Sequence, residues 1–394
     1  WAPLMDRFAP KFLGRRRGWI LISQVALALG LVGMAISAPE DGPTLIAVFA
    51  VFVAFASASQ DIVIDAYSTD VLEPHERAAG ASAKVMGYRF AMLVSATVTA
   101  LVGDWVSWRA GYLVMAALMA SAVLATLWAP RAPVVSAPRS LADAISKPLT
   151  EFFTRKRAVW LLVLVVVYKL TDAFAGTLFQ AFLRQELGFS PTEIALINKN
   201  GGFAALLAGL AIGGIIMARI GLFRSLFLFG VLQALSNLVF MALAETAYDP
   251  LLATNLMWHQ HHAGGLASGA FYAIAEVGKD YPLMVVSIVV ENITGGMGTA
   301  VFVAFLMSLC DTRFTATQYA LLSSLSSVGR TLIAPTAGPI VAATSWTTFF
   351  LITTLVAIPG LVLLLWLKPQ IVGLDRRRPR EVAPEPTPNP QPSS

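Results

Sequence analysis

Charged side chains interrupt two long apolar segments near the start of the chain. The apolar run at 44–59 continues into "QDIVID", which carries Asp61 and Asp65, and the apolar segment that follows carries Lys84 and Arg89. A charged side chain at the centre of a membrane span costs about 2.5–3.5 kcal/mol on insertion scales, so each group needs a partner, a proton or water. This cost makes the four residues candidates for ion pairing, proton transfer or ligand binding.

A second set of polar side chains interrupts the apolar segments of the later part of the chain. Its members are Lys169, Asp172, Lys199, Glu291, Asn292 and Arg330. At a rise of about 1.5 Å per residue, Lys169 and Glu291 fall near the middle of their segments. Groups of both signs spread through the bilayer favour a wet path, because intramembrane ionisable residues usually face a cavity or a proton route. The alternative for any one residue is a buried ion pair that only holds two helices together.

The composition indicates that these groups belong to a membrane protein. Of 394 residues, 57% are hydrophobic and 13% charged, and the mean hydropathy is +0.70, whereas a soluble domain is about half apolar and a quarter charged. Apolar runs of about eighteen residues or more, each able to cross ~30 Å of hydrocarbon as a helix, recur along the chain. Lipid cannot satisfy open backbone groups, so we predict an all-α polytopic fold.

The hydropathy pattern predicts ten membrane-spanning helices. Their expected ranges are about 18–38, 44–66, 79–101, 109–129, 158–181, 192–217, 223–245, 281–309, 314–343 and 346–367. Most of the 28 Lys and Arg residues fall in the segments that this alternation places in the cytoplasm, and only Arg109, Arg184 and Lys279 fall on the opposite side. The positive-inside rule therefore supports both the count and the orientation. The same asymmetry accounts for the net charge of +5 without a nucleic-acid partner.

The order of the segments predicts two bundles. We expect residues 1–129 to be the remainder of an N-terminal six-helix bundle whose first two helices are missing, and 158–367 to be a C-terminal six-helix bundle. Residues 130–157 form the expected cytoplasmic linker, with a Pro-rich start and an amphipathic stretch, and 368–394 a disordered cytoplasmic tail. The chain thus resembles ten helices of a twelve-helix parent.

Neither metal nor cofactor chemistry is indicated. The lone Cys310 has no partner for a disulfide and no zinc-type spacing to a His. The "WHQHHAGG" segment at 258–265 falls in an expected periplasmic loop without a nearby Cys, which disfavours a metal site. We expect no resident metal and no cofactor.

Two glycine-rich stretches allow two interpretations. "GLAIG" at 209–213 has the GxxxG spacing, and "ENITGGMGTA" at 291–300 places three glycines in one span. Close helix packing is the interpretation that we favour. The alternative is a locally unwound helix beside Glu291.

Four ordered blocks resemble the AmpG muropeptide permeases of the major facilitator superfamily. The blocks are "SQDIVIDAYSTDVLEPHERAAGAS" with "GYRFAMLVS" (59–95), "TDAFAGTLFQAFLRQELGFSPTEIALINK" (171–199), "VVENITGGMGTAVFVAFLMSLCDTRFTATQYALLSSLSSVGR" (289–330) and "TTFFLITTLVAIPGL" (347–361). The opening "MDRFAPKFLGRRRG" also resembles the superfamily's cytoplasmic signature, an Asp-Arg pair followed by a basic cluster, although its spacing is longer. The resemblance covers almost the whole chain.

The resemblance implies import of anhydromuropeptides, GlcNAc-1,6-anhydroMurNAc peptides, across the bacterial inner membrane for peptidoglycan recycling, driven by protons. On this basis each candidate residue receives an expected role. The expected proton-coupling residues are Glu291, Asp61 and Asp172; the expected substrate-binding residues are Arg89, Lys169, Lys199, Asn292 and Arg330; and the expected cytoplasmic-gate residues are Asp6, Arg7, Asp65 and Lys84. The expected partners are the muropeptide substrate, protons and membrane lipid.

Two other functions fit parts of the pattern. A carrier of another bulky anionic metabolite, such as acetyl-CoA, needs the same cations in the same places. A membrane-embedded acyl or glycosyl transferase needs a nucleophile, metal ligands or a paired acid and base near one interface, and the sequence shows no such set. We therefore expect a transporter and not an enzyme.

Overall fold

The computed structural model describes residues 1–37, 43–133, 135, 137–247 and 281–375, without the side chains of 199, 200, 246, 247, 281 and 375. All regular elements in this part of the chain are helices. The His-rich segment at 258–265 and the tail from 376 onward lie outside the described residues.

The N-terminal half consists of a short helix and four long ones. They are α1 (Ala2–Arg7), α2 (Gly14–Ile36), α3 (Pro43–Val71), α4 (Arg77–Trp105) and α5 (Trp108–Trp128). Each long helix is a single uninterrupted segment. The start of α5 is fixed by Ser107, whose hydroxyl accepts a hydrogen bond from the N–H of Ala110 and so satisfies one open donor of the first turn.

The expected linker contains one helix, α6 (Leu141–Phe153), after an extended approach. Ser140 caps α6 by accepting a hydrogen bond from the N–H of Asp143. Its apolar side chains gather on one side, as the sequence predicts for this amphipathic stretch.

The C-terminal half contains several helices that are built from consecutive pieces. The first expected span is α7 (Ala158–Tyr168), α8 (Leu170–Ala181) and the π-helical turn η2 (Phe182–Glu186); the second is α9 (Pro191–Leu196), the π-helical η3 (Ile197–Gly202) and α10 (Phe203–Ile220). α11 (Leu222–Ala247), α14 (Tyr281–Leu309) and α17 (Trp346–Trp366) are continuous, and the short α18 (Lys368–Asp375) follows.

The ninth expected span, 314–343, differs most from a regular helix. It is divided into α15 (Thr315–Ser326), the π-helical η4 (Gly329–Ile333), the 3₁₀ turn η5 (Ala334–Thr336) and α16 (Ala337–Ala343). Within the described residues, nine helices are long and apolar enough to cross a membrane on their own, and this divided segment is not among them. Pro335 and the small, polar residues around Ser326–Ser327 disfavour a continuous α-helix at these positions. The hydropathy pattern of the segment still predicts a span, and it does not reveal these breaks.

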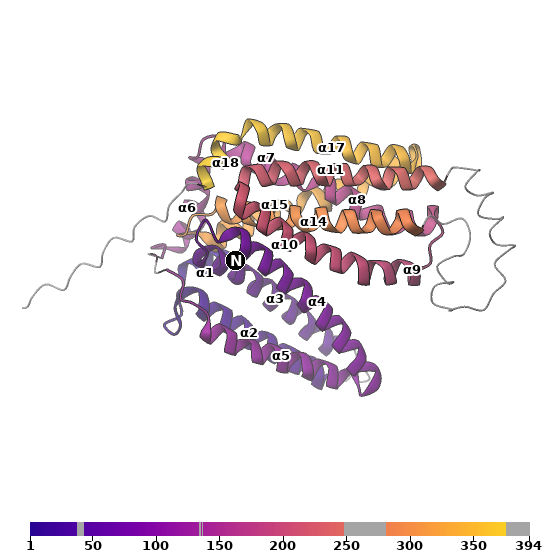
Figure 1. Cartoon of the computed structure of the whole chain (residues 1–394). Helices are drawn as coiled ribbons and strands as arrows, with labels where there is room; N and C mark the ends of the chain where they lie inside the picture. The colour runs from indigo at the N-terminus through magenta and orange to yellow at the C-terminus, as the bar shows by residue number, and fades with distance from the viewer. Residues whose placement is uncertain (38–42, 134, 136, 248–280, 376–394) are drawn as a thin grey trace, which may run out of the picture.

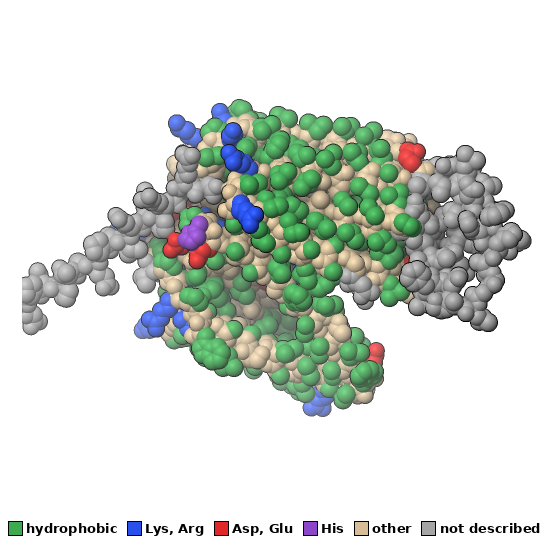
Figure 2. Space-filling view, viewed as in Figure 1, with side chains coloured by type: hydrophobic (Ala, Val, Ile, Leu, Met, Phe, Trp, Pro, Cys, Tyr) green, Lys and Arg blue, Asp and Glu red, His purple; other side chains and the backbone are tan. Residues whose placement is uncertain are grey.

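The two halves meet at one end and separate at the other (Figure 1). They converge where α1, α6 and α15 lie, and diverge toward the end that carries α9. The space-filling view is hollowed between the halves, and Lys and Arg side chains gather at the convergent end (Figure 2). By the positive-inside rule this closed end faces the cytoplasm and the open end faces the periplasm.

Glycines let α10 and α14 approach closely. A Cβ on Gly209 would stand 2.2 Å from the carbonyl oxygen of Ile293, and one on Gly213 would stand 2.8 Å from the Cα of Met297. Gly296 on α14 packs in the same way against the backbone of α10. The packing interpretation of both glycine stretches is therefore confirmed, and the alternative of an unwound segment is wrong because α14 continues as one helix through Gly295–Gly298.

The tail also begins differently from the prediction. The expected disorder starts at 368, whereas residues 368–375 form α18. Ile371 and Leu374 are buried in the C-half core together with Leu367. Burial of these apolar side chains explains why the helix persists beyond the last span.

Substitution of Gly209 by Ala tests this packing. Because the new methyl group would meet rigid backbone at 2.2 Å, we expect a loss of about 1–3 kcal/mol of stability, measured as a lower unfolding temperature in detergent. Gly87→Ala is the control, since a Cβ there meets nothing within 4 Å. Equal unfolding temperatures for the two variants would contradict the close approach of α10 and α14.

Candidate transport site and cytoplasmic gate

The buried carboxylate of Asp6 joins the N-terminal half to the first turn of α15. It accepts hydrogen bonds from the N–H groups of Ala316 (3.3 Å) and Thr317 (2.9 Å) and from the Thr317 hydroxyl (2.8 Å). The first turn of a helix has open N–H donors and a partial positive charge, so it binds an anion well. Asp6 thus holds the start of α15 against α1.

Arg16 lies between Asp6 and a second buried carboxylate, Asp70. Its guanidinium is 3.0 Å from the Asp6 carboxylate, and its Nε donates to Asp70 at 2.6 Å. The other oxygen of Asp70 accepts from the hydroxyl of Thr315 at 2.5 Å. Two carboxylates and one guanidinium therefore close the cytoplasmic end around the N-terminus of α15. We call Asp6, Arg16, Asp70, Thr315 and Thr317 the cytoplasmic latch.

Neighbouring contacts extend the latch on both sides. Arg15 donates to the carbonyls of Thr312 (3.1 Å) and Arg313 (3.3 Å) in the loop before α15. In that loop burial opposes ionisation of Asp311, but hydrogen bonds from the side chain and backbone of Arg313 outweigh it and lower the Asp311 pKa. The loop therefore keeps its charges at neutral pH.

The linker helix α6 is bound to the same region of the C-half. The buried amide of Gln318 accepts from the N–H of Asp311 (2.6 Å) and donates to the carbonyl of Pro148 (3.0 Å) and the carboxylate of Glu151 (2.8 Å). Glu151 also pairs with Arg155, whose Nη1 donates to the carbonyl of Leu309 at the end of α14 (2.5 Å). Two of these three hydrogen bonds connect the Gln318 amide with α6, and the third, from Asp311, lies within the C-half.

The sequence-predicted gate residues occupy three different environments. Asp6 belongs to the latch. Lys84 and Asp65 form an ion pair between α4 and α3, and the Lys84 ammonium lies 5.0 Å from the centre of the Tyr319 ring on α15. Arg7 is outside the latch; its guanidinium lies over the ring of Phe8 instead.

The prediction missed Arg16 and Asp70. Arg16 belongs to the basic cluster of the signature, but its spacing from Asp6 does not reveal which Arg returns to the carboxylate. Asp70 is the third acid of "DIVIDAYSTD", nine residues after Asp61. A turn-by-turn count places Asp70 one helix turn or more below Asp65, which is the only signal that could have found it.

Deeper in the C-half, Lys169 lies at the break between α7 and α8. Its ammonium is 2.8 Å from the carboxylate of Asp172 and 5.3 Å from the centre of the Phe302 ring. The expected substrate-binding cation and the expected proton-coupling acid are thus paired with each other in this conformation.

Glu291 on α14 has a neutral partner. The hydroxyl of Ser236 on α11 donates to its carboxylate at 2.6 Å. Among the described side chains, Lys169 and Asp172 are the charged groups close enough to act on Glu291 electrostatically. The three ionisable groups therefore belong to one neighbourhood inside the C-half.

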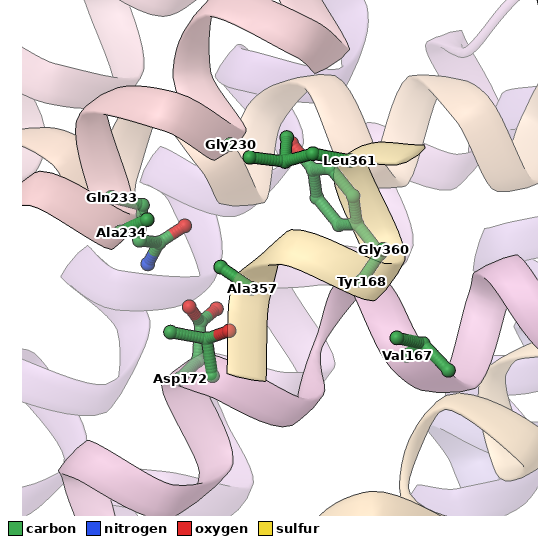
Figure 3. A pocket seen from close by; sticks show the side chains of 10 residues that line it. Val167, Tyr168, Asp172, Gly230, Gln233, Ala234, Ala357, Gly360 and Leu361 are labelled. Atoms are coloured by element: carbon green, nitrogen blue, oxygen red, sulfur yellow. The ribbon is translucent and has the colours of Figure 1, made fainter. Parts of the chain in front are cut away.

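A small pocket opens beside this group (Figure 3). Tyr168, Asp172, Gln233 and small residues of α11 and α17 line its volume of about 20 Å³. In the close-up, the Gln233 amide and the Asp172 carboxylate point toward the same space from different helices. Such a volume is large enough for one water molecule, which would lie beside the Asp172 carboxylate.

The breaks in the C-half helices coincide with its intramembrane cations. Lys169 separates α7 from α8, Lys199 lies in η3, and Arg330 lies in η4. π-Helical turns are uncommon and frequent at functional sites, and interrupted helices in transporters expose backbone groups to ligands. The side chain of Lys199 itself lies outside the described part of the structure.

Several predicted site residues have no partner among the described residues. No ion pair or hydrogen bond is made by the side chains of Asp61 and Arg330, both exposed, and the buried Nε of Arg89 has no acceptor. The ring of Phe90, next to Arg89, packs against Phe203 at the start of α10 (5.8 Å between ring centres), which places this part of α4 near the seam between the halves. These charges remain available for an ion or a ligand.

Amide groups gather beside η3. A Cβ on Gly202 would stand 2.5 Å from the oxygen of Asn198 and 3.1 Å from the nitrogen of Asn292. The Asn292 amide also donates to the carbonyl of Ile288 (2.8 Å). The predicted Asn292 therefore lies beside a second amide, Asn198, at the α14–η3 contact.

The fold and this distribution of charges define a membrane transporter. The model of the Major Facilitator Superfamily matches residues 1–258 and 262–393, so the chain belongs to that superfamily. The prediction of a multi-pass transporter, and not an enzyme, is thereby confirmed.

Two solved structures share the fold at low identity, each with a TM-score of 0.65. They are the human organic anion transporter MFSD10 (TETRAN), 13% identical over 92% of this chain and 80% of that one, and the E. coli fucose:proton symporter, 12% identical over 93% and 86%.

Curated relatives narrow the family further. The chain is 42% identical over 367 residues to the anhydromuropeptide permease of Escherichia coli K12, which covers 93% of this chain and 68% of that protein. This similarity bears out the resemblance to AmpG-type permeases stated from the sequence blocks. The individual roles of the site residues stay predictions.

Replacement of Arg16 by Met tests the latch. The substitution leaves Asp6 and Asp70 buried without their cation. Removal of one partner of a buried ion pair destabilises a protein by about 3–5 kcal/mol. We expect the cytoplasmic end to open, so that a thiol introduced at Ser82, which packs against Gly214 of the other half, reacts faster with a polar maleimide in a Cys310→Ser background. Arg7→Met is the control and should leave the rate unchanged. The latch is refuted if both variants react at the wild-type rate.

Proposed function

We propose that this protein imports anhydromuropeptides from the periplasm to the cytoplasm of a bacterium, across the inner membrane, in symport with protons and for peptidoglycan recycling. The observation that carries the proposal is the 42% identity, over 93% of the chain, to a permease with that substrate in its name. The unpaired cations and the clustered amides of the site support it.

The chemistry of the site suits such a substrate. An anhydromuropeptide combines sugar hydroxyls with several peptide carboxylates. Arg89 and Arg330, which have no partner among the described residues, supply charge-assisted bonds to carboxylates. Asn198 and Asn292 supply donors and acceptors for hydroxyl and amide groups. Lys199, at the π-helical break, is a third cation in this proposal.

The shape of the molecule suits capture from the periplasm. The latch closes the cytoplasmic end, whereas the halves diverge at the periplasmic end (Figure 1). In alternating access the two halves rock about a site near the middle of the membrane. Opening to the cytoplasm then requires α15 to separate from Asp6 and Asp70.

Proton coupling is assigned to carboxyl groups that tolerate a change of charge. The hydroxyl of Ser236 donates to an ionised Glu291 and accepts from a protonated one, so this contact survives both states. Protonation of Asp172 would weaken its pair with Lys169 and free that cation for a substrate carboxylate. Asp61 is a further acceptor at the N-half. Each positive elementary charge that moves inward with the substrate contributes about 2.3 kcal/mol of driving free energy per 100 mV of membrane potential.

Uptake of a labelled anhydromuropeptide into vesicles tests the function directly. Reconstituted protein should accumulate the substrate when the outside is acidic, and accumulation should stop when an ionophore removes the gradient. Excess acetyl-CoA serves as competitor. Accumulation of acetyl-CoA in place of the muropeptide would overturn the proposal in favour of a different anion carrier.

Glu291→Gln separates coupling from binding. The amide keeps the shape and the contact with Ser236 but carries no proton, so we expect loss of gradient-driven accumulation with exchange of internal for external substrate retained. Asp143→Asn is the control, because Asp143 lies on the surface of α6 in a pair with Lys147. Full accumulation by the Glu291 variant would remove Glu291 from the mechanism.

Arg89→Gln and Arg330→Gln test the ligand-binding cations. Each loses a charge-assisted hydrogen bond, worth about 1.5–3 kcal/mol, so the KM for uptake should rise about 10- to 150-fold. Lys147→Gln is a matched loss of positive charge on the exposed side of α6 and should leave KM unchanged. A rise in KM that is the same for all three variants would indicate a general electrostatic effect and no specific binding.

A further inference from the structure

The linker helix α6 differs from the spans in having two adjacent apolar faces. Ala144, Pro148 and Phe152 are buried, and Phe152 belongs to the hydrophobic core of the C-half. Together with the Gln318 and Glu151 hydrogen bonds described above, this face fixes α6 beneath α15. The position of the helix is therefore determined without help from its second face.

The second face carries large apolar side chains that the protein leaves uncovered. Leu141, Ile145, Leu149 and Phe153 follow one another at intervals of four residues and are 44%, 50%, 42% and 53% exposed. Residues four apart lie above one another on a helix, so the four form one continuous row. We call this row the α6 apolar row.

Neighbouring side chains place α6 at the level of the lipid headgroups. Four residues separate Phe153 from Ala158, where the first C-half span begins. There the guanidinium of Arg157 lies 3.8 Å from the centre of the Trp366 ring, and Trp366 contacts Trp160 edge to face (5.6 Å). Trp residues with adjacent cations are typical of the membrane–water interface. The C-terminal end of the α6 apolar row is thus continuous with the lipid-facing surface of the spans.

The charge of the segment favours an anionic surface. Its bases are Arg131, Arg139, Lys147, Arg155, Lys156 and Arg157, and its acids are Asp143 and Glu151. Both acids are paired with bases of α6 or its C-terminal end. The remaining bases are exposed, and Arg139 and Lys156 lie within three residues of the two ends of α6. Basic, amphipathic helices of this kind lie in the headgroup region of membranes that contain acidic lipids.

We propose that the α6 apolar row docks into the cytoplasmic leaflet at a layer of anionic phospholipid headgroups. The apolar side chains enter the headgroup–acyl boundary, while Arg139 and Lys156 contact lipid phosphates. Because Gln318 and Arg155 tie α6 to both α15 and the end of α14, the lipid surface holds the C-half side of the cytoplasmic latch. Latch stability then depends on acidic lipid. This inference does not depend on the identity of the substrate.

Spin labels measure the depth of α6 directly. The full chain, with Cys310→Ser and single cysteines at 145, 149, 146 or 150, is reconstituted in vesicles of phosphatidylcholine and phosphatidylglycerol. Labels at 145 and 149 should be relaxed by oxygen, at a depth of about 5–10 Å, whereas labels at 146 and 150 should be relaxed by a water-soluble nickel chelate. Nickel relaxation at all four positions would place the row in the cytosol and overturn the proposal. Protection of 145 and 149 from both reagents would indicate a protein partner and overturn it equally.

A pair of variants tests the link to the latch. Ile145→Gln with Leu149→Gln removes the row without touching its hydrogen bonds, and Ser146→Gln with Thr150→Gln is the control on the polar face. Maleimide reaction of a thiol at position 82 should be slower in vesicles with phosphatidylglycerol than in phosphatidylcholine alone. The row variant should lose this difference and the control should keep it. A lipid effect that survives in the row variant, or that is absent in the parent protein, contradicts the role of α6.

Discussion

The arrangement of the whole molecule depends on one buried guanidinium, that of Arg16, between the carboxylates of Asp6 and Asp70. A buried charge without a partner is expensive, so the three groups can remain buried only together and only while the first turn of α15 supplies its N–H groups and the Thr315 hydroxyl. The N-half provides the charges and the C-half provides the helix end. Neither half alone satisfies the latch, and this mutual need keeps the cytoplasmic end closed.

Most of the other charged groups within the spans also have a partner that compensates them, but these partners lie within a single half. Lys169 with Asp172 and Lys84 with Asp65 are each compensated within one half. Glu291 is compensated by a hydroxyl that accepts either protonation state. Arg89, Arg330 and Asp61 are the groups that the described residues leave uncompensated, and they are therefore the ones whose electrostatic energy changes most when a charged ligand arrives. Binding can alter the balance between the halves because these charges begin without partners.

Much of this arrangement is readable from the sequence, and the reasons for the remainder are physical. Hydropathy and the distribution of Lys and Arg predict the spans because burial in lipid and membrane orientation act on each segment independently. The depths of Glu291 and Lys169 follow from helix rise. The pairing of Arg16 with Asp6 and Asp70 depends on where three separate helices meet, which no local pattern specifies. The helix breaks at Lys169, 197–202 and 329–333 escaped prediction because the hydropathy pattern averages over a whole span and does not distinguish a continuous α-helix from one with a local change of backbone geometry.

Those breaks distribute compliance unevenly between the two halves. The four long helices of the N-half are uninterrupted, so the N-half is the stiffer of the two halves. Three of the C-half segments are interrupted, at Lys169, at η3 and at η4, and each interruption releases carbonyl and amide groups from strict i→i+4 bonding. As the two halves rock, the C-half therefore bends more readily than the N-half, and it bends at positions that lie beside its cations.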